Sequence, residues 1–207
     1  MAHTHLNEAI KLADHIMQNW VLLALLEQKM GRQDNCLQIC EKIISMDPNN
    51  ERVYEFKGDL FQKNFQIEEA FIEYSKAVQI NPESSSAISS LGNVLKFKGK
   101  LTEALAHYKR ALKLNVNQPN TLMELMNTKL ACCDWENYDE YFQHLVNVVT
   151  AQVQRGELPC ADPFNIFMMN FTSEQKFEIA RLYSEHIKQR TLQGLQAIGE
   201  PVPQFSF

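Results

Sequence analysis

Cysteines are the residues whose chemistry stands out first, and their spacing argues against a metal site. Cys36 and Cys40 lie one helical turn apart, Cys132 and Cys133 are adjacent, and Cys160 stands alone. A structural zinc site needs four ligands, usually in two pairs of matching spacing, and this chain offers no convincing second pair. We therefore expect all five to be small core or surface residues, with no bound metal and no cofactor. Free thiols without an N-terminal export signal indicate a cytoplasmic or nuclear protein.

Carboxylates beside aromatic rings form a second candidate cluster. Asp134 and Asp139 flank Trp135 and Tyr138. Paired carboxylates can act as general acid and general base. Here they stand beside a predicted helix start, where aspartate commonly caps the backbone. We therefore assign no catalytic residue to this chain.

A third set, Asp59, Asn93 and Asn127, is evenly spaced along the chain. An amide side chain both donates and accepts hydrogen bonds, so a row of such groups suits the backbone of an extended peptide. Three charged residues share the predicted helix face and would tune its charge preference: Arg52, Glu55 and Lys96. We predict that these six residues line a peptide-binding groove. The alternative, that they are only a solvated polar surface, stays open.

The interval between these three residues recurs through the chain and identifies an internal repeat. Pro48 and Pro82 are separated by the same interval, each after a helical segment that proline cannot continue. Repeats starting at residues 17, 51, 85 and 119 align small residues where two helices would cross and large residues between them. The small ones include Ala24, Gly58, Gly92, Cys36, Ala70 and Ala104, and the large ones Tyr74, Tyr108 and Phe142. This arrangement is typical of the tetratricopeptide repeat.

The repeat predicts an all-α fold, a right-handed tetratricopeptide-repeat solenoid with a C-terminal helical linker. We expect an N-terminal capping helix over 1–16, three repeats over 17–118, a divergent fourth repeat over 119–155, and a linker with a final helix over 156–207. Gly31 and Gly99 fall between paired helices, where a left-handed residue ends the first helix at little cost. Thr172 and Gln175 have the spacing of a capping box for the final helix.

Charge and hydropathy limit the range of partners. The formal net charge of −5 leaves no general basic face for phosphates, and no apolar run is long enough to span a membrane. We expect proteins or extended peptides in the concave groove, and neither nucleic acid nor membrane; self-association is left open. A clamp for a chaperone's terminal carboxylate would need lysine and arginine where Ser89, Ser90 and Glu124 stand, so we predict that the clamp is absent.

The segment after the repeats resembles a known family. It contains Cys-Asp-Trp at 133–135, then Tyr138 and Asp139, a predicted helix, Leu-Pro at 158–159 and a further helix. This order is similar to the linker of the protein O-GlcNAc transferase family, in which tetratricopeptide repeats run into a UDP-GlcNAc-dependent glycosyltransferase. The resemblance covers about 51–184. It implies a scaffold that recruits protein substrates or partners.

Two departures from that family limit what the resemblance implies. Phe164 and Asn165 stand where the animal enzyme has a histidine pair, so no catalytic residue is carried over. The chain has seven glycines and no glycine-rich turn that could cradle a pyrophosphate, and it lacks the two Rossmann-like catalytic lobes of the family. It therefore looks like the non-catalytic front part of such an enzyme. The alternative, from a different class, is a free-standing tetratricopeptide adaptor with no link to glycosylation.

Overall fold

The computed structural model describes residues 17–167 and 169–197, and helices dominate that range. The helices are α2 (Met17–Lys29), α3 (Gln33–Met46), α4 (Glu51–Lys63), α5 (Ile67–Ile80), α6 (Ser85–Phe97), α7 (Leu101–Leu114), α8 (Pro119–Ala131), α9 (Tyr138–Gln154), α10 (Pro163–Phe167) and α11 (Ser173–Ala197). The capping helix predicted over 1–16 lies outside the described residues, as does 198–207. The chain divides into two compact units, 1–116 (unit 1) and 117–207 (unit 2).

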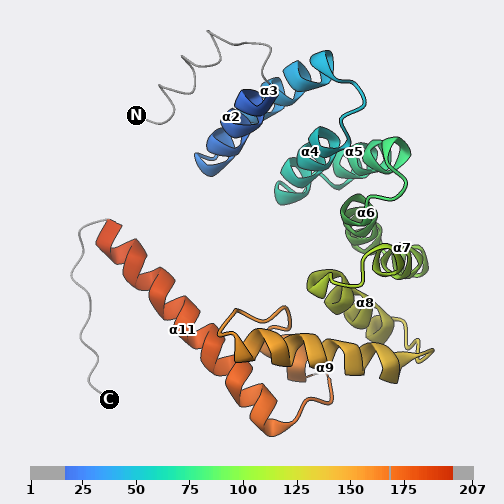
Figure 1. Cartoon of the computed structure of the whole chain (residues 1–207), viewed down its shortest axis with the longest axis vertical. Coiled ribbons are helices and arrows are strands. Elements are labelled where there is room, and N and C mark those ends of the chain that lie inside the picture. The colour runs from blue at the N-terminus through green and yellow to red at the C-terminus, as the bar shows by residue number, and fades with distance from the viewer. Residues whose placement is uncertain (1–16, 168, 198–207) are drawn as a thin grey trace. The chain divides into compact units, whose positions relative to one another are not determined.

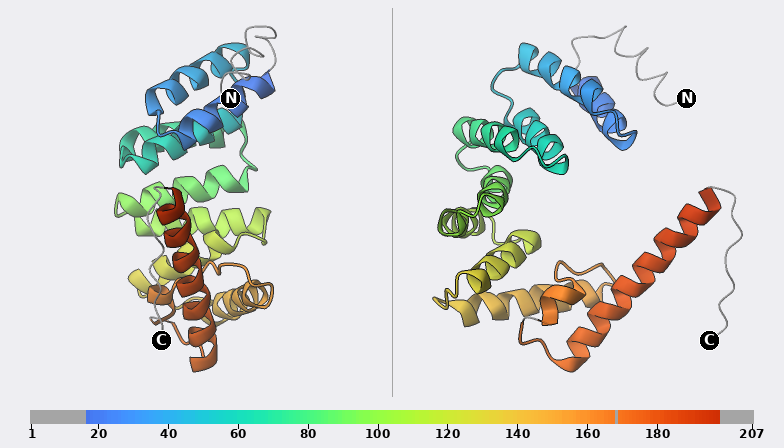
Figure 2. Two further views of the ribbon diagram at one scale, coloured as in Figure 1. Left: turned by 90° about the vertical axis from the view of Figure 1, so that its left-hand side faces the viewer. Right: turned by 180° about the vertical axis from the view of Figure 1, so that it is seen from behind.

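Unit 1 is a stack of three helical hairpins, which gives it the predicted all-α solenoid architecture. The hairpins are α2 with α3, α4 with α5, and α6 with α7, and successive hairpins touch through α3 and α4 and through α5 and α6. The first helix of one hairpin also reaches the first helix of the next, because α4 contacts α6 directly. As a result α2, α4 and α6 line one side of unit 1, and α3, α5 and α7 line the other (Figure 1). The turned views of Figure 2 show the same order of stacking.

The turn inside each hairpin repeats the same backbone geometry from one repeat to the next. Gly31 and Gly99 adopt left-handed φ angles of 71° and 74°, which confirms the prediction for both glycines. Phe65 occupies the same position in the second hairpin with φ of 59°. The residue after each turn donates its N–H to a carbonyl in the last turn of the preceding helix: Arg32 to Glu27 at 3.0 Å, Gln66 to Phe61 at 2.9 Å and Lys100 to Leu95 at 2.9 Å. These bonds close the helix ends in the manner of a Schellman motif.

Small and large residues alternate across the helix pairs of the second and third hairpins, as the repeat predicts. Ala70 and Ala104 are fully buried where the paired helices cross. Tyr74 and Tyr108 are also fully buried, one turn further along α5 and α7. The small side chains let the helices approach closely, and the tyrosine rings fill the remaining space at the density of a protein interior.

A buried ion pair interrupts the apolar core of the second hairpin. Lys57 on α4 is only 8% exposed, yet it stands at the repeat position that Leu91 holds in the third hairpin. Its Nζ lies 2.7 Å from Glu41 on α3 and 3.3 Å from Glu73 on α5. Burial alone would lower the pKa of Lys57, but the two carboxylates raise it overall. The ammonium group therefore stays charged and links three helices.

Unit 2 begins with a fourth helix pair, α8 and α9, whose turn has the same backbone form. Cys133 has φ of 51°, and the N–H of Asp134 bonds to the carbonyl of Lys129 at 2.9 Å. The fully buried Lys129 reaches back, with its Nζ 2.8 Å from Oδ2 of Asp134. Helix α11 then packs against α9 and α10. No helix in the described part of the chain is both long and apolar enough to cross a bilayer.

Candidate functional site

Five of the six predicted groove residues lie on α4 and α6 of unit 1. Arg52 and Asp59 are exposed on α4, and Glu55 is half-buried between them. Asn93 and Lys96 are half-buried on α6. The two helices contact each other directly and line the same side of unit 1 (Figure 1). Asn127 holds the same repeat position on α8, which belongs to unit 2.

Asp59 and Asn93, which hold the same repeat position in the second and third hairpins, both accept a hydrogen bond from a buried tyrosine hydroxyl. Tyr74 on α5 donates to Oδ1 of Asp59 at 2.6 Å, and Tyr108 on α7 donates to Oδ1 of Asn93 at 2.8 Å. Burial of the ring, followed by the nearby charge of Asp59, raises the pKa of Tyr74. The hydroxyl therefore stays protonated and can act as a donor at neutral pH. Asp59 and Asn93 are thus each tied to the second helix of their own hairpin.

Glycines fix the position of these tyrosines. A Cβ atom added to Gly58 would lie 2.6 to 2.8 Å from three ring atoms of Tyr74, and one on Gly92 would lie 2.7 to 3.3 Å from three ring atoms of Tyr108. Such distances are shorter than van der Waals contact, so only glycine lets the ring lie flat on the first helix. Reasoning from the sequence missed this link, although its signal is present: glycine and tyrosine are paired at the same spacing in both repeats.

Glu55 joins the second and third hairpins rather than standing free in the groove. Its Oε1 accepts a hydrogen bond of 2.7 Å from the hydroxyl of Ser84. Ser84 is the N-cap of α6, and its Oγ also accepts from the N–H of Ala87 at 3.2 Å. The carboxylate thereby helps to orient the start of α6 beside α4. Ser89 on α6 aligns with Glu55 in the repeat and is buried. A side chain at this repeat position is therefore not open to solvent in the third hairpin.

The five thiols differ in burial, and Cys160 is half-buried, with burial raising its pKa to about 11. Cys36 and Cys40 are buried in the first hairpin, and burial raises the pKa of the Cys40 thiol to about 12. Burial also raises the pKa of Cys36, whose Sγ lies 3.5 Å from the carbonyl oxygen of Ala24. Cys132 and Cys133 are exposed. Within 17–167 and 169–197, no three His, Cys, Asp or Glu side chains are grouped so that they could hold a metal ion.

The cluster around Trp135 in unit 2 is an aromatic packing unit. Trp135 meets Tyr138 edge to face, Tyr138 stacks on Phe142, and Phe142 meets Phe171 edge to face, with ring centroids 5.2, 6.1 and 5.3 Å apart. Asp134 bonds through Oδ1 to the N–H of Glu136 at 2.9 Å, forming a turn before α9. The prediction that Asp134 caps a helix is wrong: its side chain bonds the turn and Lys129, and α9 begins at Tyr138 with Asn137 as its N-cap.

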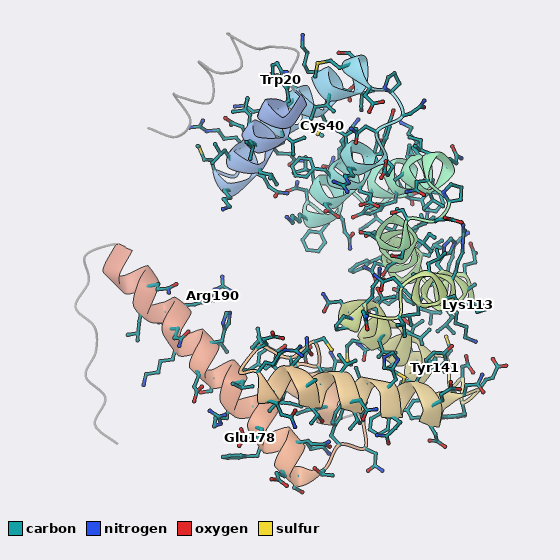
Figure 3. The ribbon with its side chains drawn as sticks, viewed as in Figure 1. Trp20, Cys40, Lys113, Tyr141, Glu178 and Arg190 are labelled. Carbon is teal, nitrogen blue, oxygen red and sulfur yellow. The ribbon has the colours of Figure 1, made fainter. Side chains whose placement is uncertain are left out.

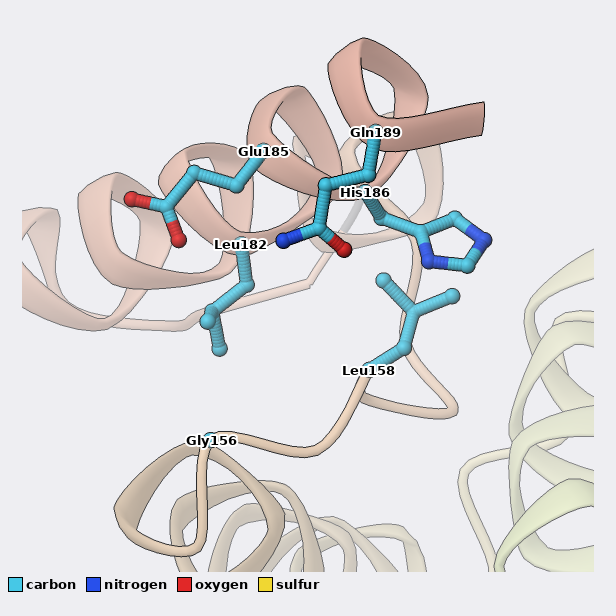
Figure 4. Close-up of a pocket in the computed structure, with 6 residues that line it drawn as sticks. All are labelled: Gly156, Leu158, Leu182, Glu185, His186 and Gln189. Carbon is cyan, nitrogen blue, oxygen red and sulfur yellow. The ribbon is translucent and has the colours of Figure 1, made fainter. Parts of the chain in front are cut away.

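Unit 2 also has a shallow pocket, formed between α11 and the segment that follows α9 (Figure 4). Leu182, Glu185, His186 and Gln189 line it from α11, and Gly156 and Leu158 line it from the segment. Thr172 and Gln175 form the predicted capping box at the start of α11, with reciprocal bonds of 3.0 and 3.2 Å. The hydroxyl of Tyr183 donates to the carbonyl of Pro159 at 2.8 Å and holds the segment against the helix.

Comparison with known proteins bears on the repeats. The tetratricopeptide repeat family model matches residues 18–50, 51–84 and 86–117. A search of curated proteins finds no match. A solved structure described as pilF of Pseudomonas aeruginosa is 19% identical, with a TM-score of 0.64, and the match covers 93% of this chain and 86% of that chain.

Two further solved structures each match a little more than half of this chain. The first tetratricopeptide domain of Spaghetti (RPAP3), bound to the HSP90 peptide SRMEEVD, is 22% identical with a TM-score of 0.54, over 57% of this chain and 94% of that chain. The O-GlcNAc transferase of Thermobaculum terrenum, as a K341M mutant, is 20% identical with a TM-score of 0.51, over 55% of this chain and 22% of that chain. At such identities the likeness is one of fold, and the fold is that of a tetratricopeptide solenoid.

Proposed function

We propose that this chain, which carries three tetratricopeptide repeats over residues 18–117, binds an extended segment of another protein along α4 and α6. Asp59 and Asn93 carry the proposal, because they recur at one repeat position on adjoining helices that line the same side of unit 1. Polar groups at such intervals suit main-chain hydrogen bonding to an extended peptide. A structural neighbour solved with a bound peptide supports the same use of the fold.

Charged residues of the same helices would set which peptides bind. Arg52 is exposed on α4, and Lys96 is half-buried on α6 with its Nζ 5.8 Å from the centre of the Phe97 ring. These cations and Glu55 would make affinity depend on salt, because exposed charges are screened within about 10 Å at 0.1 M ionic strength. Asn127 holds the same repeat position as Asn93, on α8 in unit 2.

The direct test is binding of a panel of short fluorescein-labelled peptides, measured by fluorescence polarisation. Each side-chain bond to a peptide backbone contributes only about 0.5–1.5 kcal/mol, so affinity depends on several acting together. We expect Asn93→Ala to weaken the best peptide a few-fold. Lys113, an exposed residue of α7 (Figure 3), supplies the matched control. An equal loss with Lys113→Ala would move the binding surface to the second helices.

The finer proposal is that the bound protein is recruited for an O-GlcNAc transferase-like enzyme, as the front part of such a protein would do. It is supported by the Cys-Asp-Trp segment at 133–135 and by the fold shared with the Thermobaculum terrenum enzyme. The free thiols favour a cytoplasmic or nuclear setting for this role. The rival, an adaptor unconnected with glycosylation, is supported by the broader match to pilF. Under both proposals calorimetry should detect no binding of UDP-GlcNAc to this chain; micromolar binding would contradict them.

A further inference from the structure

Helix α2 carries apolar side chains on two opposite faces. Leu23 and Ala24 are buried in the core of the first hairpin. Val21, Leu22 and Leu25 lie on the other face and are 43%, 52% and 44% exposed. A helix that is apolar on opposite faces normally buries both of them. In the described part of the chain the second face of α2 stays half exposed, which leaves it open to a partner.

The exposed apolar residues of α2 hold the same repeat positions as residues of α4 and α6. Leu25 aligns with Asp59 and Asn93. Leu22 aligns with Phe56, which is half-buried and packs against the core shared by the first and second hairpins. The helices α2, α4 and α6 line one side of unit 1 (Figure 1). By position, the apolar face of α2 therefore continues the row of Asp59 and Asn93 into the first hairpin.

We propose that the first hairpin adds an apolar subsite for one end of the bound polypeptide, the α2 subsite, made of Val21, Leu22, Leu25 and Phe56. The occupant is an extended segment of another protein that carries two large aliphatic or aromatic side chains at that end. This inference rests on the proposed function and specifies its ligand. At the aligned positions the side chains change from apolar on α2 to mixed on α4 and polar on α6. The ligand should have the matching order, with apolar residues on α2 and backbone hydrogen bonds on α6.

Helix spacing sets how far the apolar end of the ligand lies from its polar end. Neighbouring packed helices lie about 8–10 Å apart, and an extended chain advances about 3.3 Å per residue. Helix α4 stands between α2 and α6, so the ligand crosses two such spacings. Its large apolar residues should therefore lie about five or six residues from the backbone group that bonds to Asn93.

Residues 1–16 of this chain are the main alternative occupant, and their repeat positions argue against it. Leu6 and Ala9 stand one repeat interval before Cys40 and Ile43 of α3. The sequence therefore predicts the role of a second helix for this segment. In the described repeats the second helices line the side of unit 1 away from α2 (Figure 1). A segment in that role would leave the α2 subsite open to a ligand.

The protein variant gives α2 the side chains that α6 carries at the same repeat positions. Leu22→Ser with Leu25→Asn copies Ser90 and Asn93. We expect this double variant to bind the best panel peptide about tenfold more weakly than the parent. Its melting temperature should equal that of the parent, because both leucines are already half exposed. Ile72→Asn is the matched control, because Ile72 is 51% exposed on the second helix α5; an equal loss with this control would overturn the α2 subsite.

Substitutions in the peptide locate its apolar end. The best panel peptide is compared with forms in which one large apolar residue at a time is replaced by serine. One replacement should weaken binding to the parent about tenfold and cost little further in the double variant, because the contact is already lost. Equal costs with both proteins would overturn the inference. If Asn93→Ala still weakens that peptide, the proposed function stands; if no panel peptide binds the parent, the proposed function fails, and this inference fails with it.

Two further results would assign the apolar face of α2 to a different occupant. A lower melting temperature of the double variant, with unchanged peptide affinity, would mean that residues 1–16 cover the face. A dimer of the parent that the double variant loses, measured by sedimentation velocity, would mean that a second copy of the chain covers it. Either result would overturn the α2 subsite.

Discussion

The second and third hairpins of unit 1 share one shape but differ in the polar groups that they bury. Both place a tyrosine ring on a glycine, a buried alanine at the helix crossing and a left-handed residue in the turn. The second hairpin adds the Lys57 ion pair and a strained Phe65. The third has Leu91 and Gly99 at those positions, and the half-buried His107 where Glu73 stands. A few small and large residues at fixed repeat positions are therefore enough to specify the hairpin, whereas its buried polar residues differ from one repeat to the next.

The glycine beneath each tyrosine should be the most sensitive point of both hairpins. Gly58→Ala would force the buried ring of Tyr74 to move, at a cost of about 3 kcal/mol in unfolding free energy. Gly92→Ala should cost less, about 1–2 kcal/mol, because its nearest ring atoms are more distant. Urea unfolding followed by circular dichroism measures both. The double variant Gly58→Ala with Tyr74→Cys mimics the first repeat and should recover part of the loss; equal stability of parent and Gly58→Ala would contradict this contact.

Loss of the ion pair in the second hairpin should have the next largest effect on the unfolding free energy. Lys57→Ala leaves the buried Glu73 with Lys76 alone, whose Nζ is 3.5 Å away, and should cost about 2–3 kcal/mol. Lys57→Leu with Glu73→His copies the third hairpin and should be near the parent in stability, since it removes both buried charges. Chemical denaturation of the two variants tests the difference. If Lys57→Ala and the double variant lost the same stability, apolar packing would not be able to replace the ion pair.

The tyrosine hydroxyls should have smaller effects that differ between the hairpins. The Tyr74 hydroxyl bonds to the charged Asp59 and also lies 2.9 Å from Oε1 of Gln62, and the bond from Tyr108 to Asn93 is to a neutral amide. Hydrogen bonds to charged groups contribute about 1.5–3 kcal/mol and neutral ones about 1 kcal/mol. Tyr74→Phe should therefore destabilise unit 1 more than Tyr108→Phe, and thermal melting of the pair provides the comparison. The reverse order would show that the Asp59 bond is screened by water.

The turn should show the smallest effect, with opposite signs in the two hairpins. Phe65 has a left-handed backbone and a side chain that is 82% exposed, so little packing offsets its strain. Phe65→Gly should stabilise the protein by about 1 kcal/mol, and Gly99→Phe should destabilise it by a similar amount. Melting temperatures give the sign directly. A loss of stability in Phe65→Gly would mean that the aromatic side chain contributes to folding.

Local patterns in the sequence were enough to predict the helices and the repeat. Pro48 and Pro82, and Gly31 and Gly99, each act within a few residues of their own position, and the small residues recur at the repeat interval. The observed helices begin and end where the repeat register indicated, because backbone hydrogen bonds and turn geometry are short-range. The same register identified the groove residues on α4 and α6, although their use as a binding site stays a prediction.

Tertiary structure alone decided how those residues are bonded. The Tyr74–Asp59 and Tyr108–Asn93 bonds join the two helices of a hairpin, and Lys57 reaches back to Glu41 on α3 and forward to Glu73 on α5. It also decided that Phe65 and Cys133 adopt backbone angles that their side chains disfavour. These features cannot be predicted from any single position, because each depends on which side chains two packed helices bring together. The sequence determined where helices form and cross, and packing determined which polar side chains bond to one another.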